Sequence, residues 1–157
     1  MVKVGFVVEG ISDKKLIESA IFKDWAKQEC GLEILDEVVD AGGNRNMCSH
    51  KIEIYIDLVV IARKAMESWF LADTEAMRKW LGDENFQLAN PEETDEMPWD
   101  YIKKLGKNSP KQRGPGSKIA FARKFIRDYG FDVCRAAKHP NCPSSKYFIM
   151  KLYELGK

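Results

Sequence analysis

Two carboxylates lie close together near the start of the chain, in the sequence GFVVEGISDKK. Glu9 directly follows an apolar run, and Asp13 comes four residues later, after a Gly-Ile-Ser turn. Two carboxylates in one pocket repel each other, so one stays protonated unless a cation joins them. Mg²⁺ or Mn²⁺ would meet that need, because hard cations prefer oxygen ligands. The alternative is a plain strand-turn-helix connection with Asp13 beside a helix N-terminus, and the spacing alone favours that alternative.

A second group of acids lies in the segment ARKAMESWFLAD. Glu67 is surrounded there by apolar residues, which indicates either the wet edge of a helix or a functional site. Asp73 precedes Thr-Glu-Ala, a pattern that favours a helix N-cap over metal ligation. Arg63 and Lys64 could neutralise Glu67 in an ion pair, or they could face a phosphate.

The net charge of +1 conceals an uneven distribution of charge. Residues 100–157 contain fourteen Lys or Arg against four Asp or Glu, and residues 1–99 contain eleven against twenty. An acidic part could hold a metal ion and a basic part could hold phosphates. The alternative is two solvated faces, which composition alone slightly favours. Lys111 and Arg113, in a Pro- and Gly-rich basic loop at 108–117, are the better candidates for phosphate contact.

These residues must be positioned by an alternation of strands and helices in the first half of the chain. In order, the pattern predicts a strand at 3–9, a helix at 13–30, a strand at 32–40, a short helix at 49–57 and a strand at 58–62. Ser12 is the expected N-cap of the first helix, and Gly31 is expected to end it. Such alternation is typical of a parallel sheet flanked by helices, in which ligands gather at the carboxyl ends of the strands. Glu9 is at such an end.

The remainder of the chain is predicted to be mostly helical. Two helices should meet near Asp73, the second ending at Gly82, and residues 83–97 look like an exposed acidic loop. Helices are then expected at 97–106, 118–130 and 144–155, with Ser117 as the cap of the second. Its core face should contain Ile119, Ala122, Phe125 and Ile126. We therefore expect a single domain over 1–157, with an α/β core at 1–82 and a basic helical part at 98–157.

Composition excludes several classes of protein. No apolar run approaches the roughly 20 residues that span a bilayer, and no signal peptide is visible, so we expect a cytoplasmic protein without membrane contact. The four cysteines form no C-x-x-C pair, which favours reduced thiols over a disulfide framework. Neither a Ser-His-Asp arrangement nor a dinucleotide-binding fingerprint is present.

Three segments together resemble a known family. VVEGISDKKLIE resembles the first motif of Toprim domains, and ARKAMESWFLADTEAM resembles the (I/M)E-x-(W/Y)-x-L-x-D segment of the Toprim-like branch related to OLD-family nucleases. HPNCPSSKYFIMKL resembles the C-terminal end of a small Toprim-like family of unknown function. The resemblance implies a Toprim-like parallel sheet and a Mg²⁺ or Mn²⁺ site. It also implies metal-binding roles for Glu9, Asp13, Glu67 and Asp73, with Glu9 and Glu67 catalytic in phosphodiester cleavage.

The chain departs from the Toprim pattern at one place. A Toprim domain carries a D-x-D at the end of a middle strand, and none is found; Asp57 is a lone aspartate. Either the chain is naturally trimmed and inactive, or a segment of about thirty residues after Asp57 is missing from this sequence. Two hypotheses follow: a metal-dependent nuclease acting on DNA or RNA, or an inactive Toprim-like module that binds nucleic acid or a partner ATPase.

Overall fold

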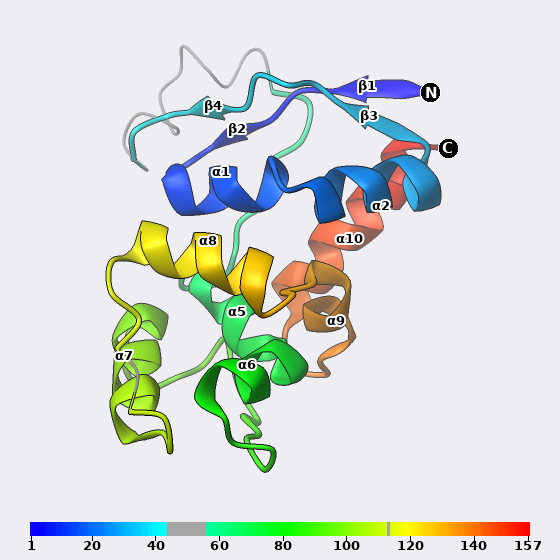
Figure 1. The fold of residues 1–157 in the computed structure, drawn as a ribbon. Coiled ribbons are helices and arrows are strands. Elements are labelled where there is room, and N and C mark those ends of the chain that lie inside the picture. The colour runs from blue at the N-terminus through cyan, green and yellow to red at the C-terminus, as the bar shows by residue number, and fades with distance from the viewer. Residues whose placement is uncertain (44–55, 113) are drawn as a thin grey trace. The chain divides into compact units, whose positions relative to one another are not determined.

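A computed structural model of the protein describes residues 1–43, 56–112 and 114–157 (Figure 1). The chain divides into two compact units, of which unit 1 comprises Met1–Ile61 and Met150–Lys157, and unit 2 comprises Ala62–Ile149. Each unit has buried apolar residues of its own. The single domain expected over 1–157 stays a prediction. The helix expected at 49–57 lies almost wholly outside the described residues.

Unit 1 contains two short pairs of parallel strands. β1 (Val2–Val4) pairs with β3 (Leu32–Ile34), and β2 (Val7–Val8) pairs with β4 (Val39–Asp40). The predicted strands at 3–9 and 32–40 are therefore each split in two. Parallel pairing between them is confirmed, as is the mixed α/β class.

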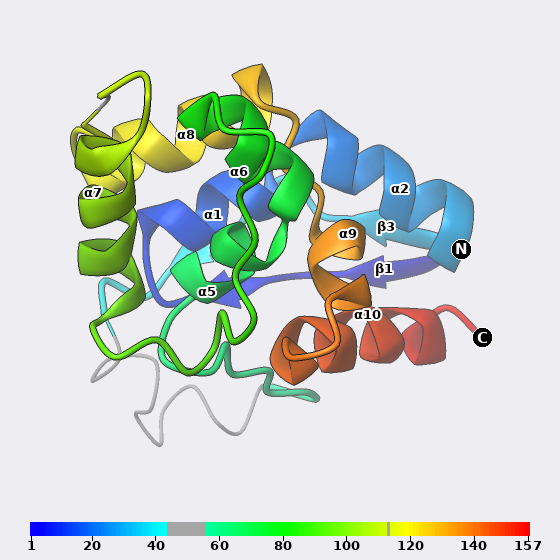
Figure 2. The ribbon, with the colours of Figure 1, turned by 90° about the horizontal axis from the view of Figure 1, so that it is seen from below.

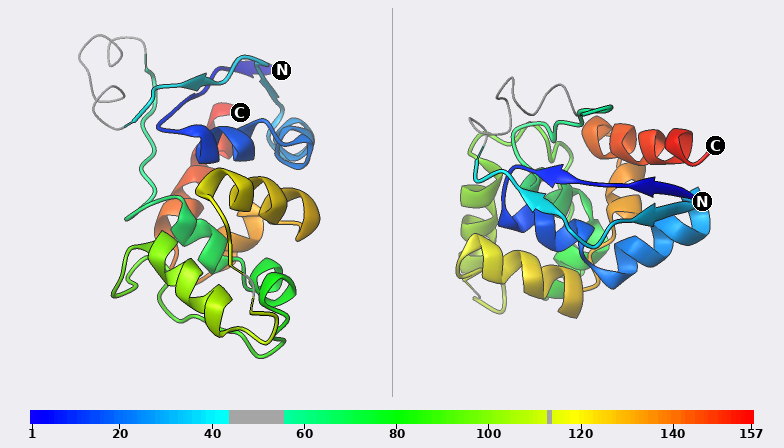
Figure 3. Two further views of the ribbon diagram at one scale, coloured as in Figure 1. Left: turned by 60° about the vertical axis from the view of Figure 1, so that its left-hand side comes forward. Right: turned by 90° about the horizontal axis from the view of Figure 1, so that it is seen from above.

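Two helices connect the strand pairs and lie on one side of them (Figure 3). They are α1 (Ile11–Ile17) and α2 (Ala20–Cys30), so the single helix predicted over 13–30 is wrong. The break lies at Ser19, whose backbone is extended and whose hydroxyl accepts a hydrogen bond from Phe22 N at 3.3 Å. A serine in this position caps a new helix instead of continuing the old one.

The ends of these helices are set by local chemistry. Gly10, and not the predicted Ser12, is the N-cap of α1. Gly31 ends α2 with a φ of 69°, a left-handed conformation that glycine adopts at little steric cost, as predicted.

The last turn of the chain packs against the end of α2 within unit 1. The rings of Trp25 and Tyr153 meet edge to face with centroids 5.8 Å apart. A Cβ atom at Gly156 would lie 1.6 Å from the carbonyl oxygen of Cys30, so only glycine allows this approach.

Unit 2 is helical. Its elements are α5 (Glu67–Ala72), α6 (Thr74–Leu81), α7 (Pro98–Asn108), α8 (Lys118–Asp128), α9 (Val133–Lys138) and the first half of α10 (Pro143–Leu155). All six residues of α5 are buried, and α5 contacts α6, α7 and α9 (Figure 2). The segment that carries Glu67 is thus the central helix of this unit. Sequence patterns predicted every element of unit 2 except α9.

The core of unit 2 is an aromatic cluster. The ring of Phe70 on α5 lies 5.7 Å from Phe121, 5.3 Å from Phe125 and 4.8 Å from Phe131, in edge-to-face arrangements. Aromatic pairs at such distances contribute stability beyond the area that they bury. Phe121, not Ile119, completes the core face of α8, because Ile119 is 37% exposed and Phe121 is 2% exposed. The predicted position of Ile119 in the core is wrong.

Two other predictions fail where a segment depends on distant partners. Residues 58–62 form no strand, and Ile61 is 76% exposed. The segment 83–97 is not an exposed loop throughout, because Phe86, Pro91, Glu92 and Thr94 are buried. Among the described residues, no helix is both long and apolar enough to cross a bilayer.

Candidate functional site

The carboxyl edge of the parallel pair β2–β4 positions Glu9. Its side chain is exposed, and its carbonyl oxygen accepts a hydrogen bond from Gly43 N at 2.8 Å. Asp40 ends β4 opposite Val8, so it is a second carboxylate-bearing residue at the same edge. Its Oδ1 atom accepts a hydrogen bond from Gly42 N at 2.8 Å. Sequence reasoning missed Asp40, although it ends an apolar strand just as Glu9 does.

Asp13 lies in the first turn of α1. Its Oδ2 atom accepts a hydrogen bond from Gly10 N at 3.1 Å, and this satisfies a donor that would otherwise lack a partner at the start of the helix. A carboxylate there also interacts favourably with the helix dipole. The contact supports the strand-turn-helix interpretation of Asp13, while its role as a metal ligand stays a prediction.

Glu67 begins α5 and is only 5% exposed. Its Oε1 atom lies 3.3 Å from the ammonium of Lys118, at the first residue of α8. The same ammonium lies 6.0 Å from the centroid of the Trp99 ring, which provides a further favourable contact for the cation. The sequence offered the neighbours Arg63 and Lys64 as counter-ions of Glu67. Among the described residues it is Lys118 that neutralises Glu67, whereas Arg63 and Lys64 have other partners.

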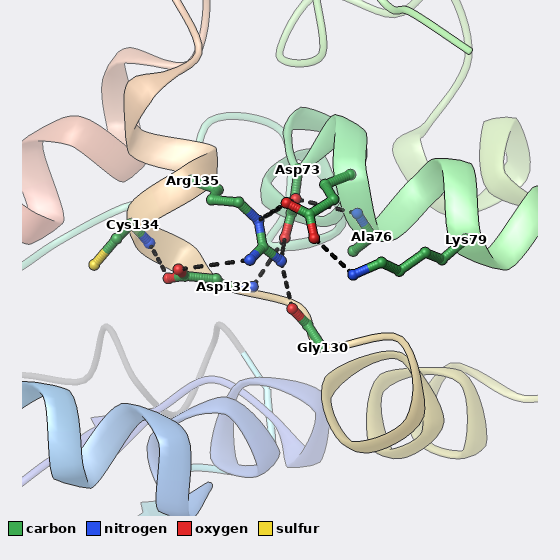
Figure 4. A network of polar contacts seen from close by, with 8 residues as sticks. Asp73, Ala76, Lys79, Gly130, Asp132, Cys134 and Arg135 are labelled. Carbon is green, nitrogen blue, oxygen red and sulfur yellow. Dashed lines mark hydrogen bonds and ion pairs between the residues drawn. The ribbon is translucent and has the colours of Figure 1, made fainter. Parts of the chain in front are cut away.

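Asp73 is fully buried and holds α6 and α9 together (Figure 4). Its Oδ1 atom accepts from Ala76 N at 3.2 Å and from Arg135 Nε at 2.9 Å. Its Oδ2 atom accepts from Asp132 N at 2.9 Å and from an Arg135 terminal nitrogen at 2.9 Å. The N-cap predicted for Asp73 is confirmed. Both oxygens already accept two hydrogen bonds, and this argues against metal ligation.

The ion pair raises the pKa of Arg135 above its usual range. Burial opposes this by penalising the charged guanidinium, but the hydrogen bonds and charge of Asp73, with Glu75 and Asp132, outweigh it. The guanidinium also donates to the carbonyl oxygen of Gly130. Arg135 therefore joins the N-cap of α6 to the turn that precedes α9.

The predicted metal ligands are divided between the two units. Glu9 and Asp13 belong to unit 1, and Glu67 and Asp73 belong to unit 2. Within the described part of the chain, no group of three or more His, Cys, Asp or Glu residues could hold a metal ion. A site made jointly by these four acids stays a prediction.

Three of the four cations proposed for phosphate contact have partners within the protein. Arg63 pairs with Glu93 at 3.0 Å, and Lys64 donates to the carbonyl oxygen of Thr94. Lys111 donates to a carbonyl near the end of α6, that of Lys79, at 3.3 Å. The fourth candidate, Arg113, lies outside the described residues. Arg63 and Glu93 are each 58% exposed, so their pair is open to water.

Sequence reasoning also missed a buried polar cluster around Glu92. Its Oε1 atom accepts hydrogen bonds from the Cys142 thiol at 3.2 Å, from Ser144 N at 3.0 Å and from the Ser144 hydroxyl. Its Oε2 atom is buried without a hydrogen-bond partner among the described residues. Burial is the main reason that the pKa of the Cys142 thiol rises to about 12, so this thiol is not a nucleophile at neutral pH.

Two further hydrogen-bonding contacts join the segment before α10 to the loop that contains Glu92. His139 Nε2 lies 3.0 Å from the carbonyl oxygen of Leu88, and Asn141 donates to the carbonyl oxygen of Ala89 at 2.9 Å. The segment HPNCPSS is thereby the docking partner of residues 88–92. Its pattern of His, Asn, Cys and Ser thus serves the packing of a loop in this structure.

Fold and site geometry define a mixed α/β protein with short parallel strands and a helical second unit. No family model matches the chain, and no curated protein or solved structure matches it either.

Proposed function

We propose that this protein is a Toprim-like module that binds nucleic acid through cations of its second unit. The observation that supports this function most directly is the segment 101–127, which contains nine Lys or Arg residues and no Asp or Glu. Cations that neutralise phosphates supply most of the sequence-independent affinity for nucleic acid.

Contacts within the segment reduce the number of cations available for phosphate. Lys103 and Lys104 form ion pairs of 2.8 Å with Asp100 and Glu96, and Lys118 pairs with Glu67. Arg127 pairs with Asp128, and Lys111 donates to a carbonyl oxygen. The remaining described cations of the segment make no ion pair with any described residue: Lys107, Arg123 and Lys124. All three are exposed. Three phosphate contacts correspond to a slope of roughly −2 for log K against log salt with a single strand.

The experiment measures the binding of labelled oligonucleotides by fluorescence anisotropy at several salt concentrations. The double variant Arg123→Gln/Lys124→Gln should bind more weakly and should flatten the slope by about 1.4. A matched control, Lys3→Gln/Lys27→Gln, removes the same charge from exposed positions of unit 1 and should leave the slope unchanged. Equal losses in both variants, or no binding by the unaltered protein, would overturn the proposal. The second result would leave a partner protein such as an ATPase as the alternative.

A second candidate function is metal-dependent phosphodiester cleavage, which the exposed Glu9 beside Asp40 favours. A bound Mg²⁺ or Mn²⁺ would activate water and stabilise the leaving oxygen. Glu9 fits such an ion best, because its carboxylate is exposed, whereas Asp73 already accepts four hydrogen bonds. Plasmid nicking with Mn²⁺ should be lost in Glu9→Gln and retained in Glu33→Gln, an exposed control on β3. Nicking that survives Glu9→Gln would exclude this function.

A further inference from the structure

Unit 2 contains a cavity that is lined by none of the predicted site residues that the structure describes. Its volume is about 360 Å³, and it is lined by Trp80, Gly114, Pro115, Phe121, Lys124 and Tyr129. Pockets for small ligands have volumes of about 300–1,000 Å³, so this cavity is at the small end of that range. A cavity of this size can hold a planar ring system.

Three of the six lining residues of the cavity are aromatic. Trp80 and Phe121 are 4% and 2% exposed, and their ring centroids lie 5.0 Å apart at 77°. Their positions are therefore fixed by the core of unit 2. Tyr129, at the end of α8, is half-buried and adds a third ring. Because the rings of Trp80 and Phe121 are almost wholly buried, Tyr129 is the ring of this lining that a ligand can reach. Accessible aromatic rings are what the bases of single-stranded nucleic acids stack upon.

One cation completes the cavity. Lys124 is exposed and makes no ion pair with a described residue, although its charge helps to lower the pKa of Asp128, after the larger effect of Arg127. Arg123, also exposed and on the same helix, adds a second positive charge near this position in the sequence. A cavity with an accessible aromatic ring and a cation at its lining matches a ligand that joins a flat ring to an anion.

We propose that this cavity holds one unstacked base, with the adjacent phosphate at Lys124. The inference rests on the proposed function and makes it more specific, because a base must leave a duplex to enter the cavity. It predicts preference for single strands over duplexes. A free mononucleotide has the same chemistry, and the experiment separates the two sources.

The test compares two ten-residue oligonucleotides that carry the same phosphates: a deoxythymidine oligomer and an oligomer of abasic sites. The unaltered protein should bind the thymidine oligomer about tenfold more tightly, since base–aromatic stacking is lost in the abasic one. Tyr129→Leu should remove most of that difference, whereas Lys124→Gln should weaken both by a similar factor. Tyr101→Leu, a half-buried tyrosine on α7 outside the cavity, is the matched control and should retain the full difference. A thermal melt of each variant establishes that it is folded.

The outcomes separate this inference from the proposed function. Equal affinity for the two oligomers, or a difference that survives Tyr129→Leu, would overturn the base-binding cavity and leave nucleic-acid binding through phosphates intact. No binding of either oligomer would overturn both. Thymidine monophosphate that displaces the thymidine oligomer at equal nucleotide concentration would assign the cavity to a free nucleotide and overturn the single-strand preference.

Discussion

The buried pair of Asp73 and Arg135 allows a quantitative test of how unit 2 is held together. Asp73 is fully buried, and two of its four hydrogen bonds come from the guanidinium, each at 2.9 Å. Arg135→Met keeps much of the apolar stem but removes both bonds and the charge. The carboxylate then remains buried with only backbone donors, those of Ala76 and Asp132.

The expected magnitude follows from the burial of the two partners. Removing one partner of a buried ion pair costs about 3–5 kcal/mol, because the other charge is left uncompensated. The Arg135 side chain is 31% exposed, so it has lost only part of its hydration in the folded state. The lower end of the range therefore applies, and we expect the free energy of unfolding to fall by about 3 kcal/mol.

Urea unfolding followed by tryptophan fluorescence at pH 7 measures this loss. Asp73→Asn keeps an oxygen that can accept from Ala76 N but removes the charge. The double variant Asp73→Asn/Arg135→Met should be less destabilised than the sum of the single variants, by about 2 kcal/mol. Lys79→Met is the control, because it breaks a 2.6 Å pair with Glu75 in which both side chains are more than half exposed. The free energy of unfolding of that variant should be close to that of the unaltered protein.

If Arg135→Met loses no more free energy of unfolding than Lys79→Met, the buried pair of Asp73 and Arg135 does not stabilise the protein as argued. Strict additivity in the double variant would lead to the same conclusion, because the carboxylate and the guanidinium would then stabilise the fold independently.

Three further predictions concern the thiol of Cys142, the pair of Glu67 with Lys118, and Gly82. Burial raises the pKa of the Cys142 thiol from 9.0 to about 12, so the free energy of unfolding should fall by about 1.4 kcal/mol per pH unit above pH 9. Urea unfolding at several pH values should show this slope, and Cys142→Ala should remove it. Lys118→Met should lower the free energy of unfolding by about 1–2 kcal/mol, because Glu67 is left buried without its cation. Adding Glu67→Gln should restore part of that free energy, and a double variant that restores none would contradict a stabilising ion pair between the two residues. Gly82→Ala should lower the free energy of unfolding by about 1–2 kcal/mol, because φ is 68° and the new Cβ would lie 2.4 Å from Lys111 Cε. In chemical unfolding, a Lys111→Ala background should relieve the clash with Lys111 but not the cost of the left-handed backbone.

The features that sequence predicted correctly are those fixed by local chemistry. Asp73 and Ser117 cap helices because their side-chain oxygens reach backbone N–H groups a few residues ahead, at Ala76 and Ala120. Gly31 and Gly82 end helices because each adopts a left-handed conformation. None of these signals depends on the rest of the fold.

The features that sequence missed depend on partners far along the chain. The apolar segment 58–62 has the composition of a strand, but composition does not supply a neighbouring strand with which to pair. The loop at 83–97 is acidic and contains a proline, yet Glu92 is buried because Cys142 and Ser144 donate to it from 50 and 52 residues away. A pattern read in a short window cannot include such donors.

The same limit applies to the candidate metal site, and it bears on function. The resemblance to Toprim domains implied metal-binding roles for Glu67 and Asp73, but Lys118 and Arg135 neutralise these acids from 51 and 62 residues away. A divalent ion would have to displace those cations and break the hydrogen bonds of Asp73, at a cost that an exposed carboxylate such as Glu9 does not carry. The contacts of Glu67 and Asp73 therefore argue against a metal ion at these two acids. They leave Glu9 as the position at which a metal-dependent activity is best tested.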